Sequence, residues 1–410
     1  MAAIISPSAI QSPELKTLPP LSLYIHIPWC VKKCPYCDFN SHQARGGKSN
    51  IPEDDYVAAL IRDLESALPQ IWGRKIVSVF FGGGTPSLFS AKSIDALLTA
   101  VRALLPLEHF AEITLEANPG TFEAQKFADF RAAGINRLSV GIQSFNARHL
   151  QALGRIHDDS ESRRAVEIAL KNFDNVNLDL MYALPGQTLE QTRNDIETAQ
   201  AYGVPHISAY HLTLEPNTLF HRNPPPLPDD DSAAAMQEMI EQTLADNGYQ
   251  HYETSAFAKP GMESRHNLNY WLFGDYLGIG AGAHSKLSFA DRIVRQMRYK
   301  QPKEYLARMA PGRPVSETAI QEQQEVGRDD RRFEFMMNAL RLSGGFATEL
   351  FQERTGLPIT AIQRQLDQAE QRGLLVRDHQ RIMPTLTGRR FLNDLLQIFL
   401  PEKKGCRQNT

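Results

Sequence analysis

Short apolar runs alternate with longer amphipathic segments along the first half of the chain. The runs have the length of buried strands, and the segments between them carry apolar residues at helical spacing. Strands that alternate with helices are typical of βαβ units in a parallel sheet. We expect strands at residues 21–27, 76–81, 112–117, 137–141, 175–181 and 206–214, and helices at 54–68, 91–104, 121–133, 160–171 and 189–201. Six such units would form an α/β fold, a partial TIM-like (β/α)6 barrel.

The second half of the chain has a different pattern. A Pro-rich turn and the acidic residues 229–231 predict a helix start, with the helix over 232–247. From about residue 322 helices dominate, at 333–340 and 358–372, followed by a small hairpin of 374–376 and 381–383. This order predicts a C-terminal helical, winged-helix-like domain. The expected division is an N-terminal extension (1–20), the barrel (21–225), a barrel extension (226–320), the C-terminal domain (321–400) and a tail (401–410).

Composition narrows the classes of function. The chain has 410 residues, 42% of them hydrophobic, and a formal net charge of −3. That length supports a large core and more than one domain, and the charge gives no reason to expect a nucleic acid as partner. The C-terminal domain lacks a basic recognition face, so we interpret it as a lid or partner surface. Residues 1–20 lack the pattern of a signal peptide and no long uncharged apolar run follows, so we expect a cytoplasmic protein.

Three cysteines lie within eight residues, directly after the first predicted strand. The loop supplies Cys30, Cys34 and Cys37 and no fourth thiol. A structural zinc ion is usually bound by four protein ligands, and a simple iron–sulfur electron carrier binds its cluster through four cysteines. Three thiolates on a 4Fe–4S cluster would leave one iron open to bind another molecule. The alternative is a zinc knuckle with His26 or His42 as fourth ligand; a disulfide is disfavoured, because the remaining cysteine, Cys406, lies in a distant polar tail.

Polar residues and glycines recur at the ends of the other predicted strands. A Gly-rich turn containing Gly83 and Gly84 follows the second strand, and Glu116 ends the third. In barrels of this kind the active site is built at the carboxyl ends of the strands. Polar residues at successive strand ends are therefore hard to explain by packing. The later members of this set are Gln143, Asp179, and Tyr210 with His211.

The segment Tyr24-Ile-His-Ile-Pro-Trp-Cys30, with the two cysteines after it, resembles the cluster loop of radical S-adenosylmethionine (SAM) enzymes. More narrowly, it is similar to the oxygen-independent coproporphyrinogen III oxidase family and its relatives, the HemW haem chaperones. The resemblance extends from about residue 21 to about residue 400. It implies that the three thiolates hold a 4Fe–4S cluster whose fourth iron is chelated by SAM.

The same resemblance implies a set of SAM contacts. Arg155 would hold the SAM carboxylate, because a guanidinium binds a carboxylate bidentately. Glu116 and the backbone of Gly83 and Gly84 would receive the ammonium group. The other implied cofactor-binding residues are Thr85 in the Gly-rich turn, Gln143 and Asp179 at the ribose, Tyr24 and Tyr36 as walls of the cluster and adenine region, and Tyr210 on the sixth strand.

Two further motifs separate the branches of this family. The oxidases carry a cysteine two residues after the third cluster cysteine, where this chain has Phe39. The Gly-rich stretch 278–285, which includes His284, does not match the second SAM site expected in the oxidases. In contrast, Arg265-His266-Asn-Leu-Asn-Tyr270-Trp271 resembles the His-Asn-x-x-Tyr-Trp signature of HemW-type proteins. This favours haem binding, with His266 either as an iron ligand or as a buried structural histidine.

Two functions remain open from the sequence. The first is a haem chaperone that carries a SAM-ligated cluster and delivers haem to acceptor haemoproteins. Respiratory proteins at a membrane surface are one class of acceptor. The second is a radical enzyme that decarboxylates porphyrinogen propionates. Phe39 and the motif at His266 favour the first. The sequence leaves the oligomeric state open, including a cluster-dependent dimer.

Overall fold

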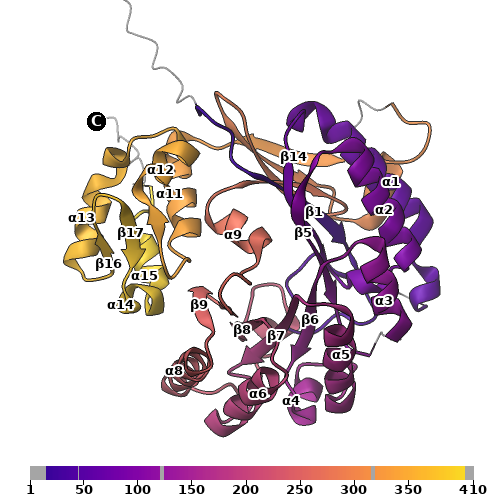
Figure 1. Ribbon diagram of the computed structural model, residues 1–410, viewed down its shortest axis with the longest axis horizontal. Helices are drawn as coiled ribbons and strands as arrows, with labels where there is room; N and C mark the ends of the chain where they lie inside the picture. The colour runs from indigo at the N-terminus through magenta and orange to yellow at the C-terminus, as the bar shows by residue number, and fades with distance from the viewer. Residues whose placement is uncertain (1–14, 45, 121–123, 315–318, 402–410) are drawn as a thin grey trace, which may run out of the picture.

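The computed structural model describes residues 15–44, 46–120, 124–314 and 319–401. A twelve-stranded sheet with the order β14-β13-β12-β11-β1-β4-β5-β6-β7-β8-β10-β9 forms its centre. Six of its strands run parallel and alternate with helices, as the sequence predicts: β1 Leu21–Ile27, β4 Ile76–Gly83, β5 Leu107–Ala117, β6 Arg137–Gln143, β7 Val176–Tyr182 and β8 His206–His211. These strands curve into an open barrel with helices on the outer face (Figure 1). The partial α/β barrel expected from the sequence is confirmed.

Helices on the outer face follow the strands in order. They are α1 Glu53–Ile71, α2 Ala91–Leu104, α3 Ala124–Ala133, α4 Ala147–Ala152, α5 Asp159–Asn172, α6 Leu189–Ala201 and α8 Asp230–Asp246. Side-chain caps explain several of the starts: Ser90 caps α2, Asp229 caps α8, and Asp158 and Thr188 form capping boxes at α5 and α6. The start predicted for α3 at residues 121–123 lies outside the described residues.

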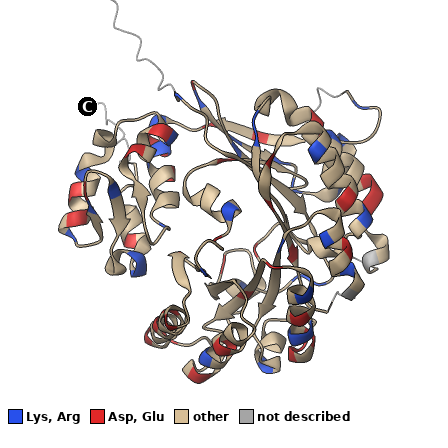
Figure 2. Cartoon of the chain, in the orientation of Figure 1, with Lys and Arg blue, Asp and Glu red and all other residues tan. Residues whose placement is uncertain are grey.

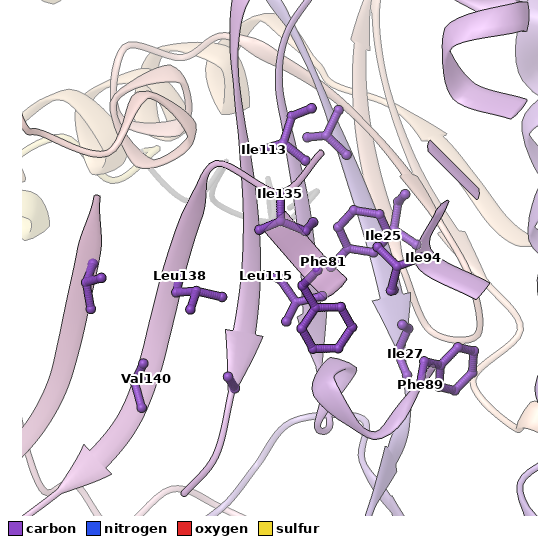
Figure 3. Packing of buried hydrophobic residues seen from close by; sticks show 14 of the residues in the cluster. Ile25, Ile27, Phe81, Phe89, Ile94, Ile113, Leu115, Ile135, Leu138 and Val140 are labelled. Carbon is purple, nitrogen blue, oxygen red and sulfur yellow. The ribbon is translucent and has the colours of Figure 1, made fainter. Parts of the chain in front are cut away.

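The core of the barrel lies between the sheet and these helices. Strand β1 is buried along almost its whole length, which is why it reads as a continuous apolar run. Figure 3 shows Ile25 and Ile27 near Phe81 of the neighbouring strand, with Ile94 close to Ile25 and Phe89 close to Ile27. The same layer continues through Ile113, Leu115, Ile135, Leu138 and Val140. The positions of these strands that alternate with the apolar ones include buried polar residues such as Ser22, Ser78 and Thr114.

The sheet extends beyond the six units at both edges. On one side, β11 Asp275–Ile279 pairs in parallel with β1, followed by the antiparallel strands β12 His284–Ser288, β13 Ile293–Arg298 and β14 Ile320–Glu325. On the other side, β10 Ala256–Ala258 and β9 Gln250–Glu253 follow β8. Strand β14 crosses the expected domain boundary at residue 320, so the extension reaches at least residue 325. The sequence missed these short strands because each has few residues and no clear alternation.

Smaller elements connect these parts. They are β2 Trp29–Cys30, β3 His42–Gln43, η1 Lys48–Asn50, η2 Pro86–Leu88, α7 Leu219–Arg222, α9 Arg265–Trp271 and α10 Pro302–Arg308. Helix α9, which carries the motif at His266, lies within the curve of the sheet and faces the C-terminal domain (Figure 1). No helix among the described residues is both long and apolar enough to cross a membrane.

The C-terminal domain has its own core and a small three-stranded sheet of order β15-β17-β16. Leu15, from the expected N-terminal extension, is buried in this core, and its amide donates to the Ala290 carbonyl. Lysine, arginine and acidic residues are mixed over the domain in the view of Figure 2. Its elements are α11 Arg328–Ala339, β15 Phe346–Ala347, α12 Thr348–Thr355, η3 Ile359–Ile362, α13 Gln363–Gln371, β16 Leu375–Arg377, β17 Arg381–Pro384, α14 Leu386–Arg390 and α15 Leu392–Gln397.

Candidate functional site

The cysteine loop is held at both ends by a short parallel pairing. Strands β2 and β3 pair Trp29 with His42, and the amide of Ala44 donates to the Cys30 carbonyl over 2.9 Å. The loop between them is therefore anchored where it leaves and where it rejoins the barrel. It carries its thiols at the carboxyl end of β1, where the sequence predicts them.

Each of the three thiols has a polar neighbour at 3.6 Å. Thr85 Oγ1 donates to Cys30 Sγ, Arg155 Nη1 donates to Cys34 Sγ, and Cys37 Sγ pairs with Ser41 Oγ. Burial, opposed by the Thr85 hydrogen bond, raises the pKa of the Cys30 thiol to about 11. Only a strong Lewis acid would displace such a proton readily at neutral pH, and iron provides one.

The three thiols face a common space. With other site residues they line a cavity of about 590 Å³ at the carboxyl ends of β1 and β4 to β8, which we call the thiol cavity. Cys30, Cys34 and Cys37 line one side of it. The cavity is large enough to receive a cluster together with a small organic molecule. The donor set and the space both fit a 4Fe–4S cluster with an open iron.

The zinc alternative does not fit this geometry. The imidazole of His26 donates from Nε2 to the Asn40 carbonyl and is bonded through Nδ1 to the Tyr24 hydroxyl. His42 shares a hydrogen bond with the side chain of Asn40. Within the described part of the chain, no three His, Cys, Asp or Glu side chains form a set that could hold a single metal ion. With both ring nitrogens engaged, His26 is not available as the fourth ligand that a zinc knuckle would need.

The Gly-rich turn is required by packing as well as by the cavity. A Cβ atom at Gly83, which has φ +115°, would lie 2.5 Å from the His26 ring, and one at Gly84 would lie 2.5 Å from the Trp29 carbonyl. Glycine is therefore needed here so that the turn can approach the cysteine loop. Gly83 and Gly84 also line the thiol cavity with Thr85.

Arg155 is aimed at the cysteine loop by two acceptors. Its Nη2 donates to Asn118 Oδ1 over 2.7 Å and to the Gly141 carbonyl over 2.6 Å. Among the described residues its buried Nε–H has no hydrogen-bond partner. A buried donor without an acceptor is costly, and a carboxylate would satisfy it. This geometry fits the predicted role of Arg155 as the holder of an anionic group.

Two carboxyl groups also line the thiol cavity. Glu116 Oε2 accepts from the Gly83 amide, and Asp179 accepts from Ser139 Oγ and Asn177 Nδ2. Burial, and then the charge of Asp179, raise the pKa of Glu116 to about 8, and burial raises the pKa of Asp179. A cationic ligand would relieve both effects, and SAM carries a sulfonium and an amino group.

The raised pKa of Glu116 makes a prediction about pH. Its ordinary value is 4.5, so the fold favours the neutral carboxyl, and this contribution to stability is lost as pH rises from about 4.5 to about 8. Glu116→Gln stays neutral and should stabilise the cofactor-free protein at pH 8, on the order of 2 kcal/mol, with little effect at pH 4.5. Urea unfolding at both pH values measures this.

A matched control is Glu197→Gln on the exposed face of α6, which should change stability equally little at both pH values. Equal effects of Glu116→Gln at pH 4.5 and pH 8 would contradict the raised pKa. The same substitution should weaken SAM binding, because the amide of glutamine cannot ionise when a cationic ligand enters the cavity.

Most of the predicted site residues meet in the thiol cavity. Gln143 lines it from the end of β6 with an unusual φ of +67°, a strained conformation of the kind found at functional sites. The members of the predicted set that line this cavity are Cys30, Cys34, Tyr36, Cys37, Gly83, Gly84, Thr85, Glu116, Gln143, Arg155, Asp179 and Tyr210.

Two predicted residues lie elsewhere. Tyr24 does not line the thiol cavity but a neighbouring space of about 370 Å³, together with Tyr270 and Tyr276. We call this space the tyrosine cavity. It shares Phe39, Gly83 and Glu116 with the thiol cavity. Tyr36 therefore remains the candidate wall of the cluster region, and the expected pairing of Tyr24 with it is corrected: their side chains line different cavities.

His266 lies behind the wall of the tyrosine cavity rather than on it. The side chain is 3% exposed, Nδ1 is hydrogen-bonded to Ser78 Oγ over 3.0 Å, and the ring stacks on Phe80 at 4.7 Å. Its edge contacts Tyr270 at 5.0 Å. Burial lowers the pKa of His266 to about 3. Of the two interpretations that the sequence left open, this geometry fits the buried structural histidine, because packing encloses the ring.

Sequence reasoning missed several residues of the thiol cavity. Asn118 donates to Thr85 Oγ1 and accepts from Arg155, and it lies two positions after Glu116 at the same strand end, which could have indicated it. Ser139 supports Asp179. Arg341 reaches the cavity from the C-terminal domain and stacks over the Trp271 ring at 4.5 Å. Nothing in the local sequence pattern points to Arg341.

Comparison with known proteins agrees with this geometry. Residues 24–199 match the radical SAM superfamily and residues 326–391 match the HemN C-terminal domain. The heme chaperone HemW of Escherichia coli K12 is 48% identical over 94% of this chain and 99% of its own, and that of Haemophilus influenzae is 50% identical over the same shares. Among solved structures, the E. coli coproporphyrinogen III oxidase HemN superposes with a TM-score of 0.77 at 24% identity, over 93% of this chain and 90% of that one.

Proposed function

This chain belongs to the HemW family of heme chaperones within the radical SAM superfamily, and from that membership we propose that it binds haem and delivers it to acceptor haemoproteins. The observation that carries the proposal is identity of about one half over nearly the full length of two HemW proteins. The likeness to the oxidase HemN, at 24% identity, concerns the fold alone. The proposed place of action is the cytoplasm, whose reducing conditions suit three free thiols.

We further propose that the thiol cavity holds a 4Fe–4S cluster and SAM. Cys30, Cys34 and Cys37 would each bind one iron. When bound, the cluster supplies an open iron for the amino and carboxylate groups of SAM and a centre for one-electron reduction.

The chain's own side chains would orient SAM in this cavity. Arg155, directed by Asn118 and Gly141, offers its unpaired Nε–H to the carboxylate. Glu116 and Asp179 offer negative charge to the cationic part of the molecule. Gln143 and Tyr210 line the remaining wall.

Phe39 supports the chaperone over the alternative, the radical decarboxylation of coproporphyrinogen III. The family resemblance places a further cysteine of the oxidases at this position. Here the side chain is an apolar ring, 62% exposed, on the rim shared by the two cavities. The ring lacks the thiol group of a cysteine, and it suits an apolar ligand.

The two functions differ in an experiment on the anaerobically reconstituted protein. We expect haem to bind stoichiometrically with an absorption band displaced from that of free haem, and we expect no decarboxylated product from coproporphyrinogen III with SAM and a reductant. Samples without SAM and without reductant are the controls. Efficient conversion of coproporphyrinogen to protoporphyrinogen would overturn the chaperone in favour of the oxidase.

A further inference from the structure

The tyrosine cavity has the lining that a flat apolar ligand requires. Its rings come from three separate elements: Tyr24 from β1, Tyr270 from α9 and Tyr276 from β11. Tyr270 and Tyr276 lie 4.3 Å apart between ring centroids, and the exposed Phe39 ring stands at the rim. Aromatic side chains favour contact with a planar macrocycle. The two cavities share the Glu116 carboxyl group, whereas the three thiols and the Asp179 carboxyl group line the thiol cavity alone.

Two histidines line the tyrosine cavity, and they differ in their bonding. His26 has both ring nitrogens engaged, with Tyr24 and with the Asn40 carbonyl. His284 stands exposed at the start of β12, and among the described residues no hydrogen bond or ion pair holds its ring. The His284 imidazole is therefore available as a ligand, whereas that of His26 is not.

The backbone that presents His284 is built for close approach to the cysteine loop. A Cβ atom at Gly278 would lie 2.0 Å from the His284 carbonyl, and one at Gly280 would lie 2.4 Å from the His26 carbonyl. The side chain of Asn40, three residues after Cys37, donates to the carbonyls of Ala281 and Lys300 at 2.9 Å. The Gly-rich stretch noted in the sequence thus places His284 at a fixed position beside the loop that carries the thiols.

The charges around His284 suit an iron porphyrin. Burial, and then the charges of Lys300 and Arg295, lower the pKa of His284, with Glu322 acting in the opposite direction. The ring is therefore neutral at pH 7, which is the form that binds iron. Lys300 is exposed beside it and offers a cation to a propionate group.

We propose that the tyrosine cavity is the haem site and that His284 is the axial ligand to the haem iron. This inference rests on the proposed function and makes it specific. The macrocycle lies against Tyr270 and Tyr276, with one edge toward Phe39 and hence toward the thiol cavity. His266 is a positioning residue: its ring, held by Ser78 and Phe80, supports Tyr270 from behind.

The test uses full-length protein with its cluster reconstituted, titrated with ferric haem under anaerobic conditions. Absorption and electron paramagnetic resonance report the axial ligand independently of any activity. We compare the wild type with His284→Ala, with His266→Gln, which can retain a hydrogen bond to Ser78, and with His379→Ala. His379 is the matched control, because it is an exposed histidine of the C-terminal domain that lines neither cavity.

We expect His284→Ala to lose the histidine-ligand spectrum and to bind haem on the order of tenfold more weakly. Added imidazole should restore the spectrum in this variant, because it can occupy the space that the side chain leaves. His379→Ala and His266→Gln should keep the wild-type spectrum, and His266→Gln should unfold at a lower temperature.

A wild-type spectrum and affinity in His284→Ala would overturn the assignment, and so would loss of the ligand spectrum in His266→Gln with an unchanged melting temperature. Failure of the wild type to bind haem would overturn the proposed function as well. The two failures are therefore distinguishable. Because His284 is exposed, His284→Ala should fold, and the intact absorption of the 4Fe–4S cluster before haem is added checks this in the same sample.

Discussion

Replacing any one of Cys30, Cys34 and Cys37 with alanine is expected to abolish the 4Fe–4S signal of the reconstituted protein. Three thiolates are the minimum set for a cluster with one open iron, so no other side chain can compensate. The structure strengthens this expectation, because both histidines near the loop, His26 and His42, are already hydrogen-bonded. The result is measured by the iron and sulfide content of each variant and by the absorption of the sulfide-to-iron charge-transfer bands.

The control for this experiment is Cys406→Ala, whose residue lies outside the described part of the chain. It should leave iron and sulfide content unchanged. Thermal unfolding of each variant without the cluster separates loss of ligand from loss of fold. Full iron and sulfide content in a variant that lacks all three loop cysteines would refute the cluster site.

Arg155→Ala is expected to weaken SAM binding to the cluster-loaded protein by about 2–4 kcal/mol, because a buried charged partner is removed. Arg155→Lys should lose less, since a point charge keeps the attraction but not the planar fork. The lysine also cannot donate to Asn118, Gly141 and a carboxylate in one plane, as the guanidinium can. Calorimetry with SAM gives the affinities.

Arg148→Ala is the matched control for Arg155→Ala. Arg148 is an exposed arginine on α4, seven positions before Arg155, and its removal should not change SAM affinity. Because Arg155 also donates to Cys34 Sγ, cluster content must be equal in all samples that are compared. An unchanged affinity in Arg155→Ala at full cluster content would show that Arg155 does not hold the carboxylate.

Much of the thiol cavity could be predicted because its residues follow two simple rules. Parallel strands that are buried on both faces read as apolar runs, and their carboxyl ends meet at one edge of the sheet. Glu116, Asp179 and Tyr210 were found in this way, although they are far apart in the chain, and all three line one cavity. The three cysteines could be predicted for a different reason, because they lie in a single loop, which β2 and β3 anchor.

Other parts of the site could not be predicted because they depend on which way a side chain faces. Tyr24 lies on β1, whose carboxyl end leads into the cysteine loop, yet its side chain lines only the tyrosine cavity. His266 belongs to a motif that indicates haem, but packing against Phe80 and Tyr270 encloses it. Arg341 lines the thiol cavity although it belongs to a different domain. Local sequence patterns do not predict contacts between residues that are so far apart in the chain.

The sequence by itself determined the six parallel strands and their helices, the loop of three thiols and the family, because apolar periodicity and residue spacing are local properties of a chain. The tertiary structure decided how the site is divided into two cavities, which histidine is enclosed and which is exposed. His266 and His284 are both followed by polar or small residues, and no local pattern separates them. Only the packing of α9 against Ser78 and Phe80 of β4, and the close approach of the Gly-rich stretch to the cysteine loop, bury one imidazole and leave the other on a cavity wall.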